Sequence, residues 1–189
     1  MKLYQAHLAS KTAYGQGRYH DTPKLERELH DAYEVRTYLH KLHTADDHVF
    51  IPPMAFKKCL EDTARYMKMP IPGRGKETYT KNFVQGVMCN EPVVLDIKAS
   101  ETRLEKVFTL SQPQKPQGGR VWKYFPVIPQ WEGILPIWVL DDIITQEVLK
   151  RHLEIAGDIT GIGVWRPQRG GLWGKFTLVG LQEKSLSPS

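Results

Sequence analysis

The chain has 189 residues, 26 Lys and Arg against 21 Asp and Glu, a formal net charge of +5, and 41% hydrophobic residues. This length and composition fit one folded domain and exclude wholesale disorder. No apolar stretch approaches the roughly 18 residues that span a bilayer, and the first residues have no apolar core with a cleavage site, so we expect no secretory signal. Cys59 and Cys89 stand alone, which favours a reducing cytoplasm and argues against disulfide-rich secreted folds and zinc fingers.

The first elements follow from periodicity and from capping residues. Apolar and polar residues alternate over residues 2–8, which predicts a half-buried strand. Helix start signals come next, with Asp21 or Thr22 as the N-cap and Pro23 at the first helical position. We therefore predict one or two helices over residues 23–43.

The most regular amphipathic pattern in the chain follows two prolines at positions 52 and 53. Its apolar positions are spaced by 4, 4 and 3 residues, and they are Phe56, Leu60, Ala64 and Met67. This spacing predicts a helix with one buried face. A basic loop containing prolines and glycines, residues 70–76, ends it.

The second half of the chain mixes strands with one helix. We predict strands over residues 92–97, 107–110 and 131–140, a long loop over 111–130, a helix capped by Thr145, and two short strands around a glycine-rich bend after residue 160. This order predicts an α+β fold with a ferredoxin-like (RRM-like) antiparallel sheet, helices on one face and inserted loops. We expect one domain over residues 1–184 and a disordered tail over 185–189.

The glycine-rich bend carries the clearest functional signal. Glycines at positions 161, 163, 170, 171 and 174 surround cations and aromatic side chains, namely Trp165, Arg166, Arg169, Trp173 and Lys175. Cations follow the phosphates of a nucleic-acid strand and aromatic rings stack on its bases. The segment has neither a phosphate-binding P-loop nor a dinucleotide fingerprint. A plain β-hairpin whose tryptophans fill the core is the structural alternative.

Two other regions combine basic residues with loops or rings. The further candidates for nucleic-acid binding are Lys57 and Lys58 on the amphipathic helix, Arg74 and Lys76 in the basic loop, and Arg120, Trp122, Lys123 and Tyr124 in the loop around residues 118–124. Alternating cations and rings suit a single strand, although solvated surface is the alternative for each cluster.

The enzymatic readings rest on histidines. A metal-free ribonuclease needs a histidine as general acid or base, and His20, beside Tyr19 and Arg18, is the catalytic candidate. Metal-ligand types cluster at His40, His43, Asp46, Asp47 and His48. No second well-spaced pair supports a metal site, so a polar helix end is favoured and we expect neither a metal nor a cofactor.

Two stretches carry a family resemblance. Residues 51–60 (IPPMAFKKCL) and residues 156–176, with their AGDITGIG and GLWGKF segments, resemble the RAMP superfamily of CRISPR-associated proteins. The likeness is strongest to the backbone subunits that polymerise along guide RNA, and a second likeness is to repeat-cleaving endoribonucleases. It implies an RRM-like fold, head-to-tail assembly, phosphate contacts from Lys57 and Lys58, and a thumb-like hairpin at residues 118–124. The short chain fits a solitary, prokaryotic or virus-encoded relative.

The favoured hypothesis is a non-enzymatic protein that binds single-stranded RNA or DNA and assembles along the strand as an oligomer or filament. The first alternative is a metal-independent endoribonuclease of the same superfamily. The second is a decoy or inhibitor that docks on a CRISPR-type protein complex.

Overall fold

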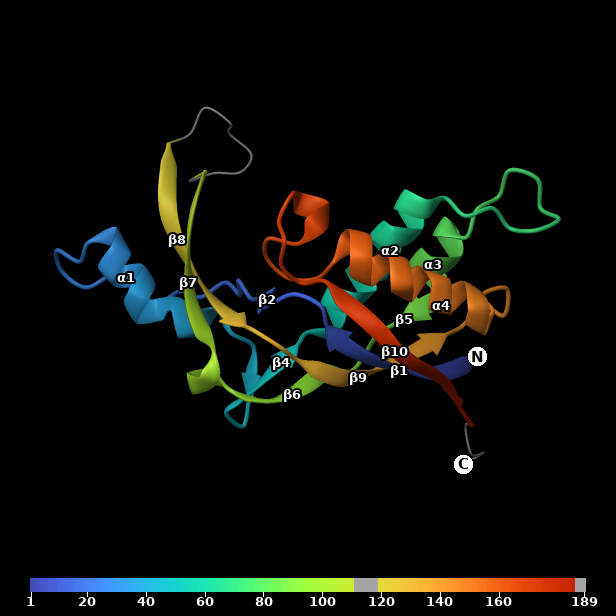
Figure 1. Cartoon of the computed structure of the whole chain (residues 1–189), viewed down its shortest axis with the longest axis horizontal. Coiled ribbons are helices and arrows are strands. Elements are labelled where there is room, and N and C mark those ends of the chain that lie inside the picture. Colours follow the sequence, from blue (N-terminus) through green and yellow to red (C-terminus); the bar gives the residue numbers. More distant parts are fainter. Residues whose placement is uncertain (111–118, 186–189) are drawn as a thin grey trace.

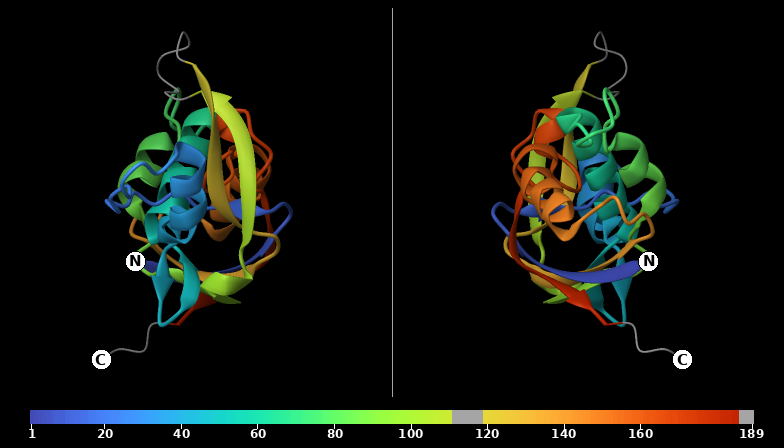
Figure 2. Two further views of the ribbon diagram at one scale, coloured as in Figure 1. Left: turned by 90° about the vertical axis from the view of Figure 1, so that its left-hand side faces the viewer. Right: turned by 90° about the vertical axis from the view of Figure 1, so that its right-hand side faces the viewer.

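The computed structural model describes residues 1–110 and 119–185. Its central unit contains four strands and two helices, which are β1 (Lys2–Ser10), α2 (Pro53–Met67), β5 (Val87–Met88), β9 (Glu132–Val139), α4 (Gln146–Ile155) and β10 (Phe176–Lys184). The strands pair antiparallel in the order β10-β1-β9-β5. This is the 4-1-3-2 order of a βαββαβ ferredoxin-like fold, as predicted, and the helices cover one face of the sheet (Figures 1 and 2).

The central unit forms where the sequence periodicity is strongest. In the middle of β1 alternate residues are buried, namely Tyr4, Ala6 and Leu8. On α2 the predicted face is buried at Phe56, Leu60 and Ala64. Burying a side chain of the size of Phe or Leu stabilises the fold by about 1.5–3 kcal/mol, so these faces fix the helix on the sheet.

Helix α4 is held at both ends. The side chain of Thr145 accepts a hydrogen bond from the backbone N–H of Val148, as expected of an N-cap. At the other end the helix continues as a π-helical turn over Ala156–Thr160. The segment from residue 161 to residue 175 then contains a 3-10 turn over Pro167–Arg169 but no strand, so the prediction of two short strands was wrong for the first of them.

A long insertion between β1 and α2 forms an arm. It comprises β2 (Tyr14–Gly15), α1 (His30–Thr37), a 3-10 helix (Tyr38–Lys41), β3 (Thr44–Ala45) and β4 (His48–Ile51). We predicted one or two helices over residues 23–43, and the structure has α1 and the 3-10 helix there, but α1 begins only seven residues after Pro23. Leu25 and Leu29 remain 61% and 77% exposed, and they supply none of the burial that would extend the helix.

A second insertion, between β5 and β9, forms a projecting hairpin. After β6 (Val93–Lys98), strands β7 (Arg103–Leu110) and β8 (Arg120–Ile128) pair antiparallel along their length. The hairpin stands away from the central sheet (Figure 1). Residues 120–128, predicted as part of a loop, are therefore a strand. The rest of that predicted loop, residues 111–118, lies outside the described residues.

The remaining elements join these parts. Helix α3 (Thr80–Gly86) follows the basic loop after α2. One three-stranded sheet has the order β2-β8-β7 and the other the order β3-β4-β6. Across residues 1–110 and 119–185, no helix has the length and apolar character needed to cross a membrane. The predicted tail lies, from residue 186, outside the described part of the chain.

Candidate nucleic-acid interface

The glycine-rich segment is packed tightly against the start of the arm. The N–H of Gly174 donates to the carbonyl of Ala13 at 2.7 Å, and the N–H of Val164 donates to the carbonyl of Gly15 at 3.0 Å. Gly174 has φ +75°, and a Cβ there would overlap the carbonyl oxygen of Ile162. Only glycine fits this position, because it tolerates positive φ and lets two backbones approach closely.

Three segments that are distant in sequence surround one cavity of about 380 Å³. They are the segment after β1 (residues 14–18), the first turns of α2 (residues 52–59) and the glycine-rich segment (residues 161–166). His43 of the arm completes the lining. We call this cavity the groove. The N-terminus of α2 lies at the groove, with Pro52 as the N-cap residue and no capping side chain. The positive end of the helix dipole therefore faces the groove.

Three cations line the groove: Arg18, Lys58 and Arg166. Lys58 is paired with Glu61 at 2.7 Å but stays largely exposed. Within residues 1–110 and 119–185, neither Arg18 nor Arg166 makes an ion pair shorter than 4.0 Å. Burial lowers the pKa of the Arg166 guanidinium, and the neighbouring Arg169 lowers it further. Arginine nevertheless keeps its charge, so the groove presents positive charge that favours an anion.

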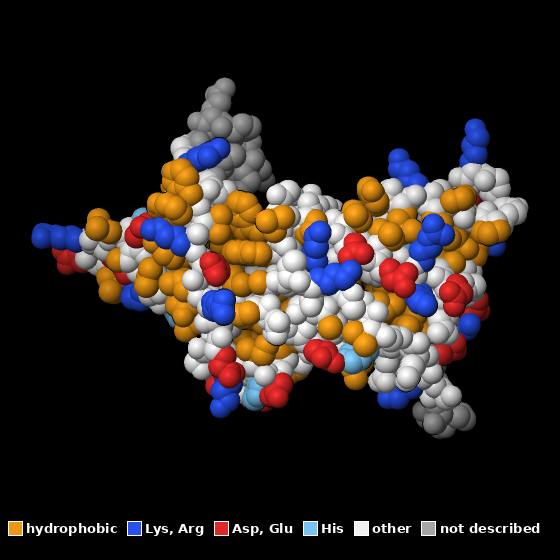
Figure 3. All heavy atoms as spheres, viewed as in Figure 1, with side chains coloured by type: hydrophobic (Ala, Val, Ile, Leu, Met, Phe, Trp, Pro, Cys, Tyr) orange, Lys and Arg blue, Asp and Glu red, His pale blue; other side chains and the backbone are white. Residues whose placement is uncertain are grey.

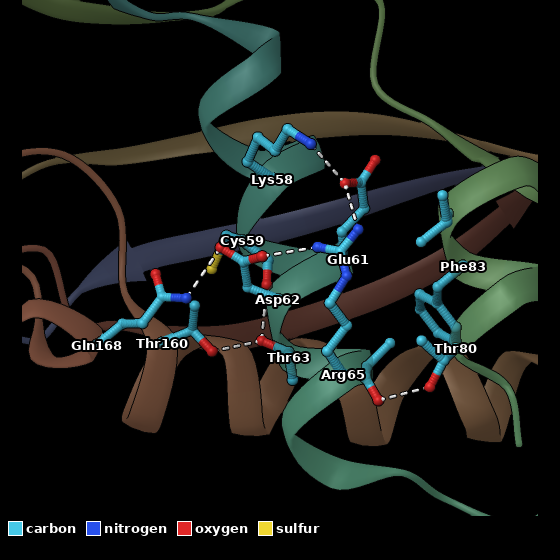
Figure 4. Close-up of polar contacts among 12 residues, drawn as sticks. Lys58, Cys59, Glu61, Asp62, Thr63, Arg65, Thr80, Phe83, Thr160 and Gln168 are labelled. Atoms are coloured by element: carbon cyan, nitrogen blue, oxygen red, sulfur yellow. Dashed lines mark hydrogen bonds and ion pairs between the residues drawn. The ribbon is translucent and has the colours of Figure 1, made fainter.

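Side chains of α2 hold the glycine-rich segment in place, as Figure 4 shows. The hydroxyls of Thr63 and Thr160 are 2.6 Å apart and buried. The side-chain amide of Gln168 donates to Asp62 at 2.9 Å. Arg166 donates to Gln168 at 2.9 Å and to the carbonyl of Gly163 at 3.2 Å. The guanidinium is therefore oriented by neutral acceptors, which do not cancel its charge.

The projecting hairpin carries two exposed aromatic side chains on the face that also contacts Asp31 of α1. Phe108 and Trp122 are direct cross-strand partners with ring centroids 4.9 Å apart, and they are 49% and 42% exposed. The ammonium of Lys106 lies 4.5 Å from the Trp122 ring centroid. Figure 3 shows hydrophobic side chains gathered over the hairpin and α1. Exposed rings with an adjacent cation form a surface on which bases can stack.

The two tryptophans of the glycine-rich segment are half-buried. Trp173 packs edge-on against Phe125 of β8, with centroids 6.4 Å apart, and this contact connects the hairpin with the groove. Trp165 has φ +54°, which is unusual for a residue with a side chain. Arg169 and Lys175 belong to the same segment, and Arg169 is exposed.

Several predicted residues lie elsewhere. Lys57 points into the protein, where its ammonium donates to the carbonyls of Phe83 and Val84 at 2.9 and 2.8 Å. Tyr124 is buried and its hydroxyl donates to Asp31 of α1.

Other candidates occupy the hairpin or the opposite end of the molecule. Arg120 is exposed at the start of β8, and Lys123 is half-buried on the same strand. Arg74 and Lys76 belong to the loop between α2 and α3, which lies at the other end of the molecule from the hairpin (Figure 1).

The histidines show which residue the sequence analysis missed. His20 packs against the rings of Tyr33 and His40 on the arm, and burial lowers its pKa. It does not line the groove, whereas His43 does. Burial, followed by the charge of Arg18, lowers the pKa of His43. Arg18 was also missed as a binding residue, although it directly follows Gly17, the last residue of a glycine-broken stretch after β1.

Metal and thiol chemistry find little support among the residues that the structure describes. No three His, Cys, Asp or Glu side chains in those ranges gather in a way that could hold a metal ion. Cys59 and Cys89 are buried thiols. Burial raises the pKa of Cys89 to about 12 and also raises the pKa of Cys59, so both are poor nucleophiles.

Comparison with known proteins finds similarity in the fold. No family model matches the chain, and no curated protein matches it either. Solved structures do match, and they confirm the fold that the sequence resemblance implies.

Two of those structures define the likeness. One is a chain of the type III-B Cmr-beta complex bound to cognate target RNA, with a TM-score of 0.55 and 10% identity over 96% of this chain. This chain spans 60% of that protein's length. The other is Cmr6 from Pyrococcus furiosus, with a TM-score of 0.50 and 11% identity, covering 94% of this chain and 98% of Cmr6.

Proposed function

We propose that this chain binds single-stranded RNA within a CRISPR-type ribonucleoprotein complex, without cleaving it. The observation that carries the proposal is the groove, in which Arg18, Lys58 and Arg166 meet beside the uncapped end of α2. The hairpin adds the exposed ring pair of Phe108 and Trp122, and its Phe125, on the opposite face, contacts Trp173 of the glycine-rich segment. Cations for phosphates and rings for bases are what a single strand requires.

The comparisons support RNA rather than DNA as the ligand. One similar structure is a Cmr-beta complex bound to target RNA. The fold alone does not fix a ligand, and the proposal therefore depends on the groove chemistry together with this likeness. The catalytic candidate, His20, lies outside the groove.

A binding titration tests the proposal. We would measure the affinity for a fluorescent 20-nucleotide RNA over a range of salt concentrations, for the natural protein and for the triple variant Arg18→Gln, Lys58→Gln, Arg166→Gln. Each lost phosphate contact should reduce the log–log salt slope by about 0.7, so the triple variant should lose about 2 units. An equimolar single-stranded DNA of the same sequence measures the preference for RNA.

The matched control removes cations at the other end of the molecule. Arg74→Gln with Lys76→Gln also removes two positive charges from a glycine-containing loop. We expect this variant to keep nearly the natural slope. Equal losses in both variants would show that net charge, and not the groove, attracts the RNA.

We also propose that copies of the chain assemble along the strand, which the resemblance to guide-RNA-binding backbone subunits supports. Mass measurements on complexes with RNAs of 10, 20 and 40 nucleotides test this assembly. A number of bound copies that rises with RNA length is the expected result, and one copy on every RNA would contradict it.

A further inference from the structure

One edge of β8 pairs with β7 along most of its length. The opposite edge pairs with another strand only near the end of β8. Strand β2 pairs with Val127 and Ile128, and the N–H of Gln16 then donates to the carbonyl of Pro126 at 3.2 Å. At Tyr124 side chains take over: the N–H of Tyr124 donates to the carboxylate of Glu34 at 3.2 Å, and its carbonyl accepts from Lys41 at 2.8 Å.

Glu34 and Lys41 form an ion pair of 2.6 Å, and their side chains are only 12% and 13% exposed. Glu34 comes from α1 and Lys41 from the 3-10 helix that follows. The pair thus supplies one acceptor and one donor to β8, as the backbone of a neighbouring strand would. Buried backbone N–H and C=O groups must find such partners, so removing the pair leaves Tyr124 unsatisfied on that edge.

The same contacts lead onwards to the proposed binding surface. The Lys41 ammonium lies 5.4 Å from the centroid of the Phe125 ring, and that ring packs against Trp173 of the glycine-rich segment. On the other face of the hairpin, Asp31 of α1 bonds to both the Tyr124 hydroxyl and Lys106. Lys106 in turn lies over Trp122, one of the two exposed rings.

We infer that the Glu34–Lys41 pair is a clip that fixes the orientation of the hairpin relative to the central unit. The clip thereby positions Phe108 and Trp122 relative to the groove. Glu34 and Lys41 are thus positioning residues, which act through β8 without touching the nucleic acid. The inference rests on the proposed function for its ligand, but the fixing of the hairpin is a property of the free protein.

The main variant is Glu34→Met with Lys41→Met. Replacing a buried ion pair by apolar side chains of similar volume is often neutral for stability, so the variant removes the clip while the chain still folds. The matched control is Glu28→Met with Arg36→Met, which removes another ion pair of the arm, 2.7 Å long, whose other hydrogen bonds go to Leu25 and Pro23.

Spin labels on Arg120→Cys and Asp142→Cys report the distance between the hairpin and the turn that follows β9 in the free protein. Both native cysteines are buried and should escape labelling. We expect a narrow distance distribution in the natural sequence and in the control, and a broad one in the clip variant. Affinity for the 20-nucleotide RNA should fall about tenfold in the clip variant, a loss comparable to one base-stacking contact.

Glu34→Gln is the conservative variant. Its amide oxygen still accepts from the Tyr124 N–H, so we expect an affinity within about threefold of the natural protein, since a single neutral hydrogen bond is weakened and not removed. It also covers the case in which the double variant does not fold.

The outcomes separate the two proposals. If the natural protein does not bind RNA, the proposed function fails, while the distance distributions still test whether the clip fixes the hairpin. Unchanged distributions and affinity in the clip variant, or an equal change in the control, would overturn the inference. A Glu34→Gln variant as impaired as the double variant would also contradict it, because the backbone bond would then be irrelevant.

Discussion

The loop of residues 70–79 and the segment of residues 161–175 have similar compositions, with glycines interspersed among cations, but different surroundings. In the loop, Gly73 and Gly75 have no heavy atom within 4 Å of where a Cβ would be. The loop bonds mainly to itself, through hydrogen bonds such as Ile71 to Glu77. In the second segment, a Cβ at Gly161, Gly163, Gly171 or Gly174 would lie within 3.0 Å of another atom, and only Gly170 faces open space as the loop glycines do. Close packing, and not composition, makes the second segment a candidate site.

The largest expected effect is a loss of stability when a glycine of the second segment is replaced by alanine. The same replacement in the loop serves as the comparison. Gly174→Ala places a Cβ against the carbonyl of Ile162 at φ +75°, and we expect it to lower the free energy of unfolding by about 4 kcal/mol, as severe steric substitutions do. Gly75→Ala faces open solvent at φ +59°, so only the cost of the left-handed backbone, about 1–2 kcal/mol, should apply. Urea denaturation measures both, and equal losses would erase the distinction between the segments.

The second effect concerns the exposed rings of the hairpin. Trp122→Ala and Phe108→Ala should each weaken RNA binding by about 5- to 100-fold, because stacking contributes about 1–3 kcal/mol per base. Thermal stability should change little, since both rings are largely exposed. Tyr66→Ala, which removes a 66%-exposed ring from α2, is the control. If it weakened binding equally, the hairpin would not be the stacking surface.

Two adjacent lysines on α2 separate stability from binding. Lys57→Met leaves the carbonyls of Phe83 and Val84 without their donor and removes one of the three cations paired with Glu61, so it should cost about 1–3 kcal/mol of stability. Lys58→Met should leave stability nearly unchanged and weaken RNA binding, because Lys58 lines the groove. Chemical denaturation and RNA titration on both variants check this, and the reverse pattern would exclude Lys58 from the interface.

The smallest effect is a pH dependence of stability. It comes from a histidine of α4 that packs against α3, the helix that follows the loop. His152 is fully buried and stacked on Phe83, and burial lowers its pKa. The unfolded chain therefore binds the proton more readily, so stability should be full above about pH 6.5 and fall below it, by at most about 1.4 kcal/mol per pH unit. His152→Leu should flatten this part of the stability–pH curve. An unchanged curve would assign the acid sensitivity to another group.

The central unit could be predicted from the sequence because its elements bury apolar faces. β1, α2, β9 and α4 all follow hydrophobic periodicity, and Thr145 caps α4 as its position suggested. The arm could not be predicted in this way. Helix α1 buries Glu34 and Thr37 and exposes Val35, so its apolar residues point away from the contact that holds it.

The candidate site was predicted only in part for a related reason. Lys58 and Arg166, two of the predicted binding residues, line the groove, but Lys57 was included in the prediction on charge alone, and its carbonyl partners come from another helix. Arg18 lies close to them only because Gly174 and Val164 bond to the segment after β1. Such pairing between distant segments leaves no local pattern in the sequence.

The position of β1 in the sheet has a consequence for how the chain is made. β1 lies between β9 and β10, and the first residue of β9 is synthesised about 120 residues after the end of β1. At about 5–20 residues per second, a ribosome needs several seconds to supply that partner. During this interval β1 has neither of its partner strands, and its apolar face stays exposed. The nascent chain should therefore depend on chaperones. Truncation before residue 132 should give aggregated fragments.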